Sequence, residues 1–220
     1  EFQPATFGSL EVSNRILLTA VLQFGASAFD EFSTFSLMDR WTLVKNFFSR
    51  YRVYEDNYRA EKAFKHDMHK TFGGYTMYFA RDEIGHFFDD TPNVGPFRTE
   101  AERVMGLSVQ RQIHGARKHL RSLNMHHEEF LGVWAIMFWD TEGMEVSEEV
   151  MHASKVIKEA ILKELESFYR EKLNLEDFAP RLGELLTLLS EYEQRSDDVK
   201  QHFEILRLLN VFTDNTLMYR

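Results

Sequence analysis

Cysteine is absent from the 220 residues of this chain. The chain therefore forms no disulfide bond and offers no thiolate ligand for a zinc site. Proline and glycine are also scarce, with 4 and 11 residues respectively. Because both residues interrupt helices, their scarcity and the long periodic stretches between them predict an all-α fold.

Long uncharged hydrophobic runs are missing as well. No run reaches the roughly 18 apolar residues that a membrane-spanning helix needs, and the N-terminal residues do not resemble a signal peptide. Acidic side chains outnumber lysine and arginine, which gives a net charge of −9. This charge argues against a role for the segment in gripping nucleic-acid phosphates.

The remaining composition is that of one globular domain. Hydrophobic residues make up 44% of the chain and include 20 Phe, which is enough to build a sizeable core. We expect residues 10–220 to form this domain and treat residues 1–9 as an N-terminal extension or a cloning remnant. The sequence holds no G-x-S-x-G motif and no phosphate-binding glycine loop, so we expect neither an enzyme nor a cofactor.

The segment from Phe24 to Arg59 carries the most regular pattern in the chain. Apolar residues recur there at intervals of three and four, which predicts a buried helix face. Ser36 precedes this helix and Asp39 follows three residues later, a spacing typical of a capping box. Periodicity alone would fit any helical bundle, so the order of residue types is the more informative feature.

That order resembles the signature of the ligand-binding domain of nuclear hormone receptors. The family's positions fall on Phe32, Phe35, Asp39, Leu43 and Val44. The segment is most similar to divergent nematode receptors related to hepatocyte-nuclear-factor-type receptors. It departs from the signature at positions 25 and 27, where glycine and serine replace the usual aromatic residue and lysine. Residues 130–173 resemble the family a second time, with an apolar helix, a loop, a serine cap and a charged helix.

The resemblance implies an all-α, three-layer antiparallel helical sandwich with one short β-hairpin. It also implies the ligand-binding domain of a nuclear transcription factor that acts through dimerisation and coregulators. A complete receptor binds DNA through a separate module that holds zinc with cysteines. This cysteine-free chain would therefore correspond to the ligand-binding half at most, with nucleic acid bound only through a module that it does not contain.

The helical pattern divides the chain into six long segments. We expect helices over residues 10–31, 36–65, 98–122, 125–140, 148–172 and 175–212, with Ser147 capping the fifth and Pro180 in the first turn of the last. Residues 71–80 contain a Gly-Gly turn and predict a hairpin, and residues 81–97 predict a mobile loop. Residues 130–139 are nearly all apolar, which predicts a helix that is surrounded on every side.

The segment 98–122 predicts a basic amphipathic helix. We expect its apolar side chains to face the core and its cationic side chains to face solvent. The inward side chains would be Val104, Leu107, Ile113 and Leu120, and the outward ones Arg103, Arg111, Arg117, Lys118 and Arg121. A basic face could contact an acidic partner, although a solvated surface is the simpler interpretation.

Two Glu-x-x-His pairs, Glu83 with His86 and Glu149 with His152, resemble half of the ligand set of a di-iron helical bundle. The numbers of Glu and His in the chain make about one such pair expected by chance. A di-iron oxidoreductase is therefore only a remote alternative, and we expect no metal. Four further histidines lie in polar surroundings and are expected to face solvent, namely His66, His69, His126 and His127.

Arg59 is the residue to which the resemblance assigns a ligand contact. In members that bind fatty acids or retinoids, an arginine at this place pairs with the ligand carboxylate. The alternative is a solvated arginine that pairs with Glu55, four residues earlier on the helix. The resemblance places five apolar residues on the cavity wall, each equally explained as ordinary core: Leu18, Val21, Leu22, Phe48 and Val53. A second alternative is an interaction scaffold whose cavity is filled by its own phenylalanines.

The resemblance also implies two protein contacts. The coregulator groove would include Ser27, Val44 and Lys45, but Ser27 stands where the charge clamp needs a lysine. Residues 214–220 resemble the start of the activation helix, with Arg220 where the second clamp charge, a glutamate, is expected. We therefore expect weak binding of Leu-x-x-Leu-Leu peptides.

A homodimer is expected through the last helix, whose apolar residues follow a near-heptad stripe. The contact residues on this stripe would be Leu185, Leu189, Val199 and Leu206. The alternative is that this stripe packs only against the core of its own chain.

Overall fold

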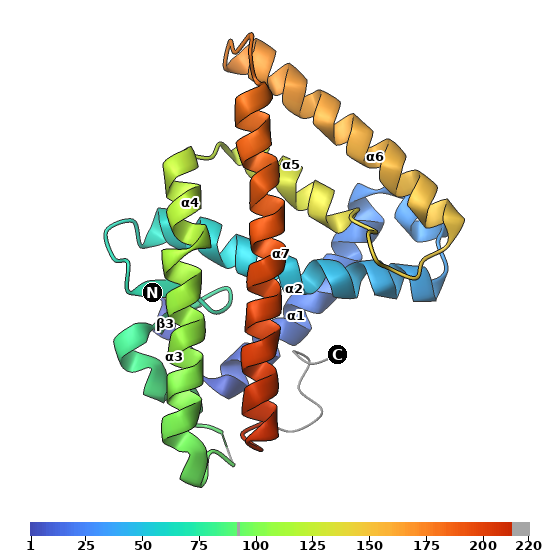
Figure 1. The fold of residues 1–220 in the computed structure, drawn as a ribbon. Helices are drawn as coiled ribbons and strands as arrows, with labels where there is room; N and C mark the ends of the chain where they lie inside the picture. Colours follow the sequence, from blue (N-terminus) through green and yellow to red (C-terminus); the bar gives the residue numbers. More distant parts are fainter. Residues whose placement is uncertain (92, 213–220) are drawn as a thin grey trace. The chain divides into compact units, whose positions relative to one another are not determined.

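The computed structural model describes residues 1–91 and 93–212. Two compact units make up the chain. Unit 1 contains residues 1–17, 52–122 and the chain from residue 192 onward, and unit 2 contains residues 18–51 and 123–191. Each unit therefore combines segments that are far apart in the sequence (Figure 1).

Seven α-helices and a small sheet account for most of the regular structure of the described residues. The helices are α1 (Phe7–Ala28), α2 (Leu37–Ala63), α3 (Arg98–His114), α4 (Ala116–Leu123), α5 (His127–Phe138), α6 (Glu148–Ser167) and α7 (Ala179–Leu208). The all-α prediction is confirmed. In the described part of the chain, no helix is both long and apolar enough to cross a membrane.

The predicted β-hairpin is present in unit 1. Strands β2 (Lys70–Phe72) and β3 (Met77–Ala80) pair antiparallel, with Thr71 opposite Phe79. The turn needs both of its glycines. A Cβ at Gly73 would overlap the ring of Phe79, and Gly74 has a φ of +154°, which other residues rarely adopt.

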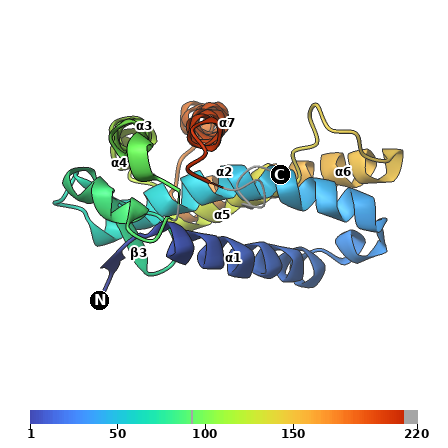
Figure 2. The ribbon, with the colours of Figure 1, turned by 90° about the horizontal axis from the view of Figure 1, so that it is seen from below.

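The N-terminal residues take part in this sheet. Strand β1 (Gln3–Pro4) pairs in parallel with β3 and leads directly into α1 (Figure 2). The hydroxyl of Thr6 donates to Asp90 at 2.6 Å, and the amide of Gly8 donates to the same carboxylate at 3.1 Å. Residues 3–9, expected as an extension, are therefore held to the rest of unit 1.

The core of unit 1 is rich in phenylalanine. Residues 81–97, expected as a mobile loop, instead form two 3-10 helices, η2 (Arg81–Phe88) and η3 (Gly95–Phe97). Phe87 and Phe88 of η2 are each 1% exposed and fix this segment in the core. In the same unit, α3 lies beside the part of α7 from residue 192 onward (Figures 1 and 2), and Arg111 of α3 and Asp198 of α7 approach to 3.7 Å.

The predicted basic helix over 98–122 is wrong in three details. It is two helices, because Gly115 adopts a non-helical conformation between α3 and α4. Leu107 was expected inside but exposes 41% of its surface, and Arg117 was expected outside but exposes none. The apolar prediction holds for the other three positions, Val104, Ile113 and Leu120, which are buried.

An aromatic cluster fills the core of unit 2. The rings of Phe29 and Phe138 stack with their centroids 5.3 Å apart, and Phe47 meets the rings of Trp134 and Phe138 edge-on. Helix α5 carries the Trp134 and Phe138 of this cluster. It is not surrounded on every side as predicted, because Leu131 exposes 46% of its surface.

Two predicted helix caps are confirmed, whereas the last helix begins at Ala179 and not at the expected residue 175. Ser36 accepts the amide of Asp39 at 3.1 Å, and Ser147 accepts the amide of Val150 at 3.4 Å. Pro180 lies in the first turn of α7, where its missing N–H leaves no hydrogen bond unmade. The Asp39 carboxylate also accepts the amide of Ser147 at 3.0 Å, so the two capped helix starts are joined.

Candidate functional site

Arg59, the predicted partner of a ligand carboxylate, lies near the C-terminal end of α2 in unit 1. Its guanidinium approaches Glu55 to 3.3 Å and donates to the carbonyl oxygens of Gly74 and Tyr75 in the hairpin turn. The guanidinium also lies 4.1 Å from the centre of the Phe72 ring. Arg59 thus anchors the hairpin to α2, and its carboxylate partner is Glu55.

A second ion pair lies beside the first on α2. Arg52 and Asp56 approach to 3.5 Å. Burial raises the pKa of Asp56 to about 7, and the charge of Arg52 offsets this effect only in part. Burial likewise raises the pKa of Glu55, against the opposing effects of Arg59 and Arg52. Both carboxyl groups therefore gain a proton more easily than usual.

Seven buried side chains of unit 1 hold polar atoms that have no hydrogen-bond partner among the described residues. They lie on α1, α2, β2, α7 and the segment after η2: Asn14, Asp56, Asn57, Thr71, Thr91, Ser196 and His202. Leaving one such atom unpaired costs about 1–3 kcal/mol. Native proteins rarely tolerate several of these costs in one region, so water or a bound molecule is expected to supply the missing partners.

The predicted wall residues are all buried or half-buried. Val21 and Val53 are each 4% exposed, and Leu18, Leu22 and Phe48 are half-buried. Val53 shares unit 1 with Arg59, whereas the other four belong to unit 2. Burial fits a cavity wall and ordinary core equally well, so the assignment of these five residues stays a prediction.

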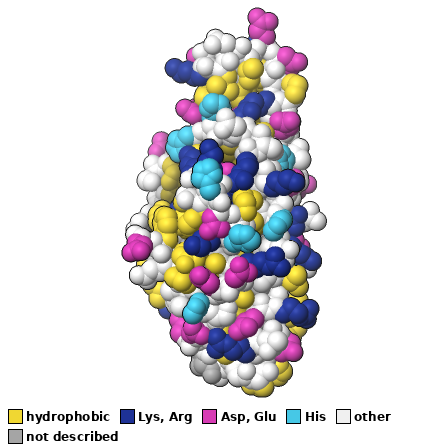
Figure 3. Space-filling model, turned by 90° about the vertical axis from the view of Figure 1, so that its left-hand side faces the viewer, with side chains coloured by type: hydrophobic (Ala, Val, Ile, Leu, Met, Phe, Trp, Pro, Cys, Tyr) yellow, Lys and Arg dark blue, Asp and Glu magenta, His cyan; other side chains and the backbone are white. Residues whose placement is uncertain are grey.

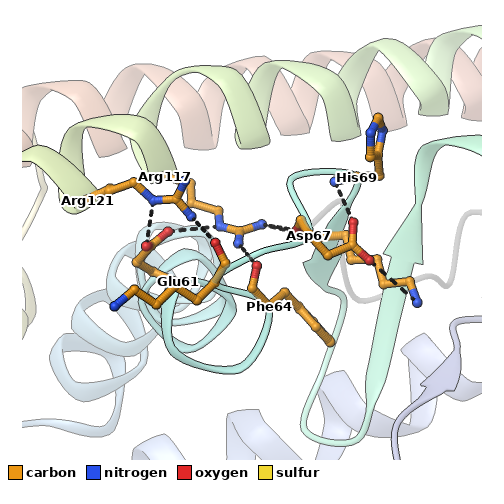
Figure 4. Close-up of polar contacts among 8 residues, drawn as sticks. Glu61, Phe64, Asp67, His69, Arg117 and Arg121 are labelled. Atoms are coloured by element: carbon orange, nitrogen blue, oxygen red, sulfur yellow. Dashed lines mark hydrogen bonds and ion pairs between the residues drawn. The ribbon is translucent and has the colours of Figure 1, made fainter.

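Arg117 is the most heavily bonded side chain in this part of unit 1 (Figure 4). Its Nε lies 3.3 Å from Glu61. Its terminal nitrogens donate to the carbonyl oxygens of Phe64, Asp67 and Lys70. These carbonyls follow the end of α2, where the chain has no helical donors for them. Arg117 therefore closes the C-terminal end of α2 and fixes the path toward β2.

Arg121 lies one helical turn after Arg117 and also contacts Glu61. Its Nε lies 2.7 Å from Glu61, and a terminal nitrogen donates to the carbonyl oxygen of Lys65 at 2.7 Å. Burial lowers the pKa of Arg117, and the charge of Glu61 counteracts that effect. Glu61 thus bridges the two arginines of α4.

The residues of the two Glu-x-x-His pairs contact other side chains or are exposed. The Tyr78 hydroxyl donates to Glu83 at 3.3 Å, and His86 lies 3.0 Å from Asp89. Glu149 and His152 are exposed on α6. Over residues 1–91 and 93–212, no group of three or more His, Asp and Glu side chains is arranged to hold a metal ion. The four histidines predicted to face solvent are all exposed.

Comparison with known proteins decides the family. The family model described as the ligand-binding domain of nuclear hormone receptors matches residues 5–209. The chain belongs to this family. This assignment confirms the resemblance seen in the sequence, including its similarity to nematode receptors. Members of the family are generally not enzymes.

Two relatives of this ligand-binding domain come from Caenorhabditis elegans. Nuclear hormone receptor family member nhr-53 is 27% identical over 218 residues, which cover 94% of this chain and 57% of that receptor. Family member nhr-86 is 24% identical over 204 residues, which cover 89% of this chain and 48% of that receptor. The chain spans about half the length of the curated relatives it matches.

The predicted coregulator residues of the ligand-binding domain lie in unit 2. Ser27 and Lys45 are exposed, and the Ser27 hydroxyl donates to the carbonyl oxygen of Phe24 at 3.1 Å. Val44 is fully buried, so it lies beneath any contact surface. Residues 214–220, which carry the predicted start of the activation helix, lie outside the described residues.

The residues predicted for dimerisation divide into two groups. Leu185 and Leu206 expose none of their surface, whereas Leu189 and Val199 are half-buried. Leu206 belongs to the core of unit 1, and Val199 packs against that core. A contact between copies through α7 stays a prediction, but it has to use side chains other than Leu185 and Leu206.

Sequence reasoning missed the buried polar residues, although the pattern held a signal for one of them. Asn14 follows Leu10 by four residues and precedes Leu17 by three, which is the spacing of a buried helix face. All three are buried, at 5% exposure or less. No comparable signal marked Arg117, because it stands among cationic residues that do face solvent.

Proposed function

We propose that this chain is the ligand-binding domain of a transcription factor that acts in the nucleus and responds to a small lipophilic ligand. The observation that carries the proposal is the set of seven side chains, buried in unit 1, that each hold at least one polar atom without a hydrogen-bond partner among the described residues. A bound molecule whose polar end supplies some of these hydrogen bonds would lower that cost to stability. DNA recognition would belong to a part of the receptor beyond this chain.

The ligand that suits this chemistry is elongated and apolar with one polar end, as in a fatty acid. Its carboxylate would replace Glu55 as the partner of Arg59, whose planar guanidinium can bind a carboxylate through two hydrogen bonds. Burial raises the pKa of Glu55, so desolvation already disfavours the charged form of the carboxylate that the ligand would replace.

Two measurements test this proposal. Mass spectrometry of an organic-solvent extract of the purified protein should reveal a carboxylic-acid lipid. In titrations with a fluorescent fatty acid, Arg59→Ala should weaken binding by about 2–5 kcal/mol, since truncation leaves one charge of a buried pair unpaired. Glu55→Gln should bind at least as tightly as the parent, because the competing carboxylate is gone.

Arg103→Ala is the matched control, because Arg103 is an exposed arginine of the same unit. Equal binding by the parent and the Arg59 variant would exclude the proposed carboxylate contact.

A receptor-like scaffold without a ligand is the second candidate. The observation that favours it is the set of five phenylalanines in the core of unit 1: Phe79, Phe87, Phe88, Phe203 and Phe212. Such a core could fill the space that other ligand-binding domains leave for a ligand. An extract without lipid, together with no saturable fatty-acid binding, would support this candidate over the first.

We propose that the domain regulates transcription through dimerisation and that it binds standard coregulators only weakly. Ser27 carries no charge to meet the negative C-terminal end of a bound helix. A labelled Leu-x-x-Leu-Leu peptide should therefore bind this chain only weakly in a fluorescence titration. Micromolar or tighter binding would show that the clamp charge is dispensable.

A further inference from the structure

One surface of unit 1 has a charge opposite to that of the whole chain. Residues 61–70 and 114–121 contain six Lys or Arg side chains and only two carboxylates, on a chain whose net charge is −9. Four histidines lie in the same two segments. Cationic and histidine side chains gather on the face that contains α4 and the end of α2 (Figure 3).

The two segments are held together by the arginines of α4. Arg117 and Arg121 bind Glu61 and the carbonyl oxygens that follow α2 (Figure 4). The second carboxylate, Asp67, accepts the amide of His69 at 2.9 Å and lies 3.8 Å from Lys70. Both carboxylates are therefore already engaged within the surface, and they leave an excess of positive charge.

The excess charge is carried by exposed side chains. Lys65, His66 and Lys118 are exposed, and the Arg121 side chain is 39% exposed although it is paired. Lys62 is exposed as well, and its amine donates to the Tyr58 hydroxyl at 2.7 Å. These side chains stand on two helix ends that Arg117 fixes to each other, so a partner would meet a preformed array.

We propose that this array binds a short acidic peptide segment of a partner protein. We call it the α4 basic surface and define it by Lys62, Lys65, His66, Lys118 and Arg121. Carboxylates of the peptide would pair with the ammonium and guanidinium groups along the two helix ends. The proposal does not depend on a bound ligand or on Arg59.

The range of electrostatic interactions favours a peptide over DNA or a membrane. At physiological salt the Debye length is about 8 Å, so a short peptide senses mainly the charges that it touches. A DNA duplex or an anionic membrane extends beyond the surface and meets the acidic remainder of the chain. Repulsion from that remainder opposes their binding, in keeping with the net charge of −9.

Fluorescence anisotropy with the 220-residue chain tests the proposal directly. The probe is a labelled short peptide of glutamate and phenylalanine, at near-physiological salt. Reversing three exposed charges, with Lys62→Glu, Lys65→Glu and Lys118→Glu, should weaken binding by about tenfold or more, because each attraction becomes a repulsion. Added salt should weaken binding of the parent in the same direction.

The control is a second variant in which three lysines outside the α4 basic surface are reversed. It changes the net charge of the chain by the same amount as the first variant. Lys155, Lys163 and Lys172 are exposed residues of unit 2, and their replacement by Glu should leave peptide binding within about twofold of the parent. Circular dichroism checks that both triple variants remain folded.

Three results would overturn the proposal. The first is equal loss of binding in both triple variants, and the second is no measurable binding by the parent. The third is tighter binding of a DNA duplex, or of phosphatidylcholine vesicles that contain phosphatidylserine, than of the peptide.

Discussion

Arg117 shows how one buried cation can organise a large part of unit 1. Helix α2 ends at Ala63, and the chain must reach β2 at Lys70. Three carbonyl oxygens on this path accept hydrogen bonds from one guanidinium, and Glu61 balances its charge. A guanidinium suits this place because its donors are planar and divergent, whereas a lysine ammonium is a single point.

We predict that Arg117→Leu destabilises the folded chain by about 3 kcal/mol or more. The substitution leaves three carbonyl oxygens without their donor and removes one of the two arginines that pair with Glu61, and breaking a buried pair from one side is strongly destabilising. Arg117→Lys should recover only part of this loss, because one ammonium cannot reach all four acceptors. The free energy of unfolding from urea titrations measures both effects.

The neighbouring Lys118→Leu provides the matched control. Lys118 is exposed on the same helix, so this change should stay within about 0.5 kcal/mol of the parent. A similar small effect of Arg117→Leu would show that the hydrogen bonds of Arg117 contribute little to stability.

At the scale of elements, the hairpin depends on the close approach of its turn to β3. Gly73 lies against the ring of Phe79, where a Cβ has no room. We predict that Gly73→Ala lowers the free energy of unfolding by about 1–3 kcal/mol through overpacking and displacement of the turn. Because Arg59 donates to the carbonyl oxygens of Gly74 and Tyr75, the same change should also disturb fatty-acid binding at Arg59.

Gly183→Ala is the opposite case and serves as the control. Gly183 lies inside α7, and a Cβ at this position would meet no atom within 4 Å. Alanine should therefore raise the free energy of unfolding by about 0.5–1 kcal/mol. If both glycine substitutions changed stability in the same direction, the close approach at Gly73 would not explain the first result.

Helices could be predicted well where the spacing of apolar residues determines their position, and poorly where a single contact determines it. The spacing of apolar residues located α1, α2 and α7, and the Ser147 cap located the start of α6. The break at Gly115 could not be predicted in this way, since the pattern of residues runs through it unchanged. Leu107 follows the apolar spacing of α3 and is nevertheless exposed, because helical spacing indicates a face but not how far the core extends along it.

The site was less predictable than the fold for a related reason. The family signature located Arg59, and Glu55 could be named as its alternative partner from the i,i+4 spacing alone. The contacts of Arg59 with the hairpin turn are long-range in sequence, and no local pattern encodes them. Asn14 is the instructive exception, because a polar residue at core spacing is visible in the sequence and the structure finds it buried.

For the molecule as a whole, the surface chemistry suggests two separate kinds of association. The α4 basic surface is polar and should respond to salt, whereas the contact expected between copies on α7 is apolar. Salt titration therefore distinguishes them, because added salt weakens the first and leaves the second unchanged or stronger.

We predict that the chain forms a homodimer through exposed apolar side chains of α7. The near-heptad stripe of this helix is directed into the chain at Leu206 and Phe203, which are buried in unit 1. The apolar side chains that remain available near them are Ile205, 44% exposed, and Leu208, 70% exposed. Ile205→Glu combined with Leu208→Glu should shift the sedimentation coefficient from dimer to monomer, because burying two carboxylates in an apolar contact is costly.

The control variants separate loss of the dimer from loss of the fold. Gln201→Glu adds a charge at another exposed position of α7 and should leave the dimer intact. Leu206→Glu, in contrast, places a charge in the core and should reduce the helical circular dichroism signal together with the dimer. The double variant should keep its full helical signal while it runs as a monomer. A parent chain that sediments as a monomer even at high concentration would contradict pairing through α7.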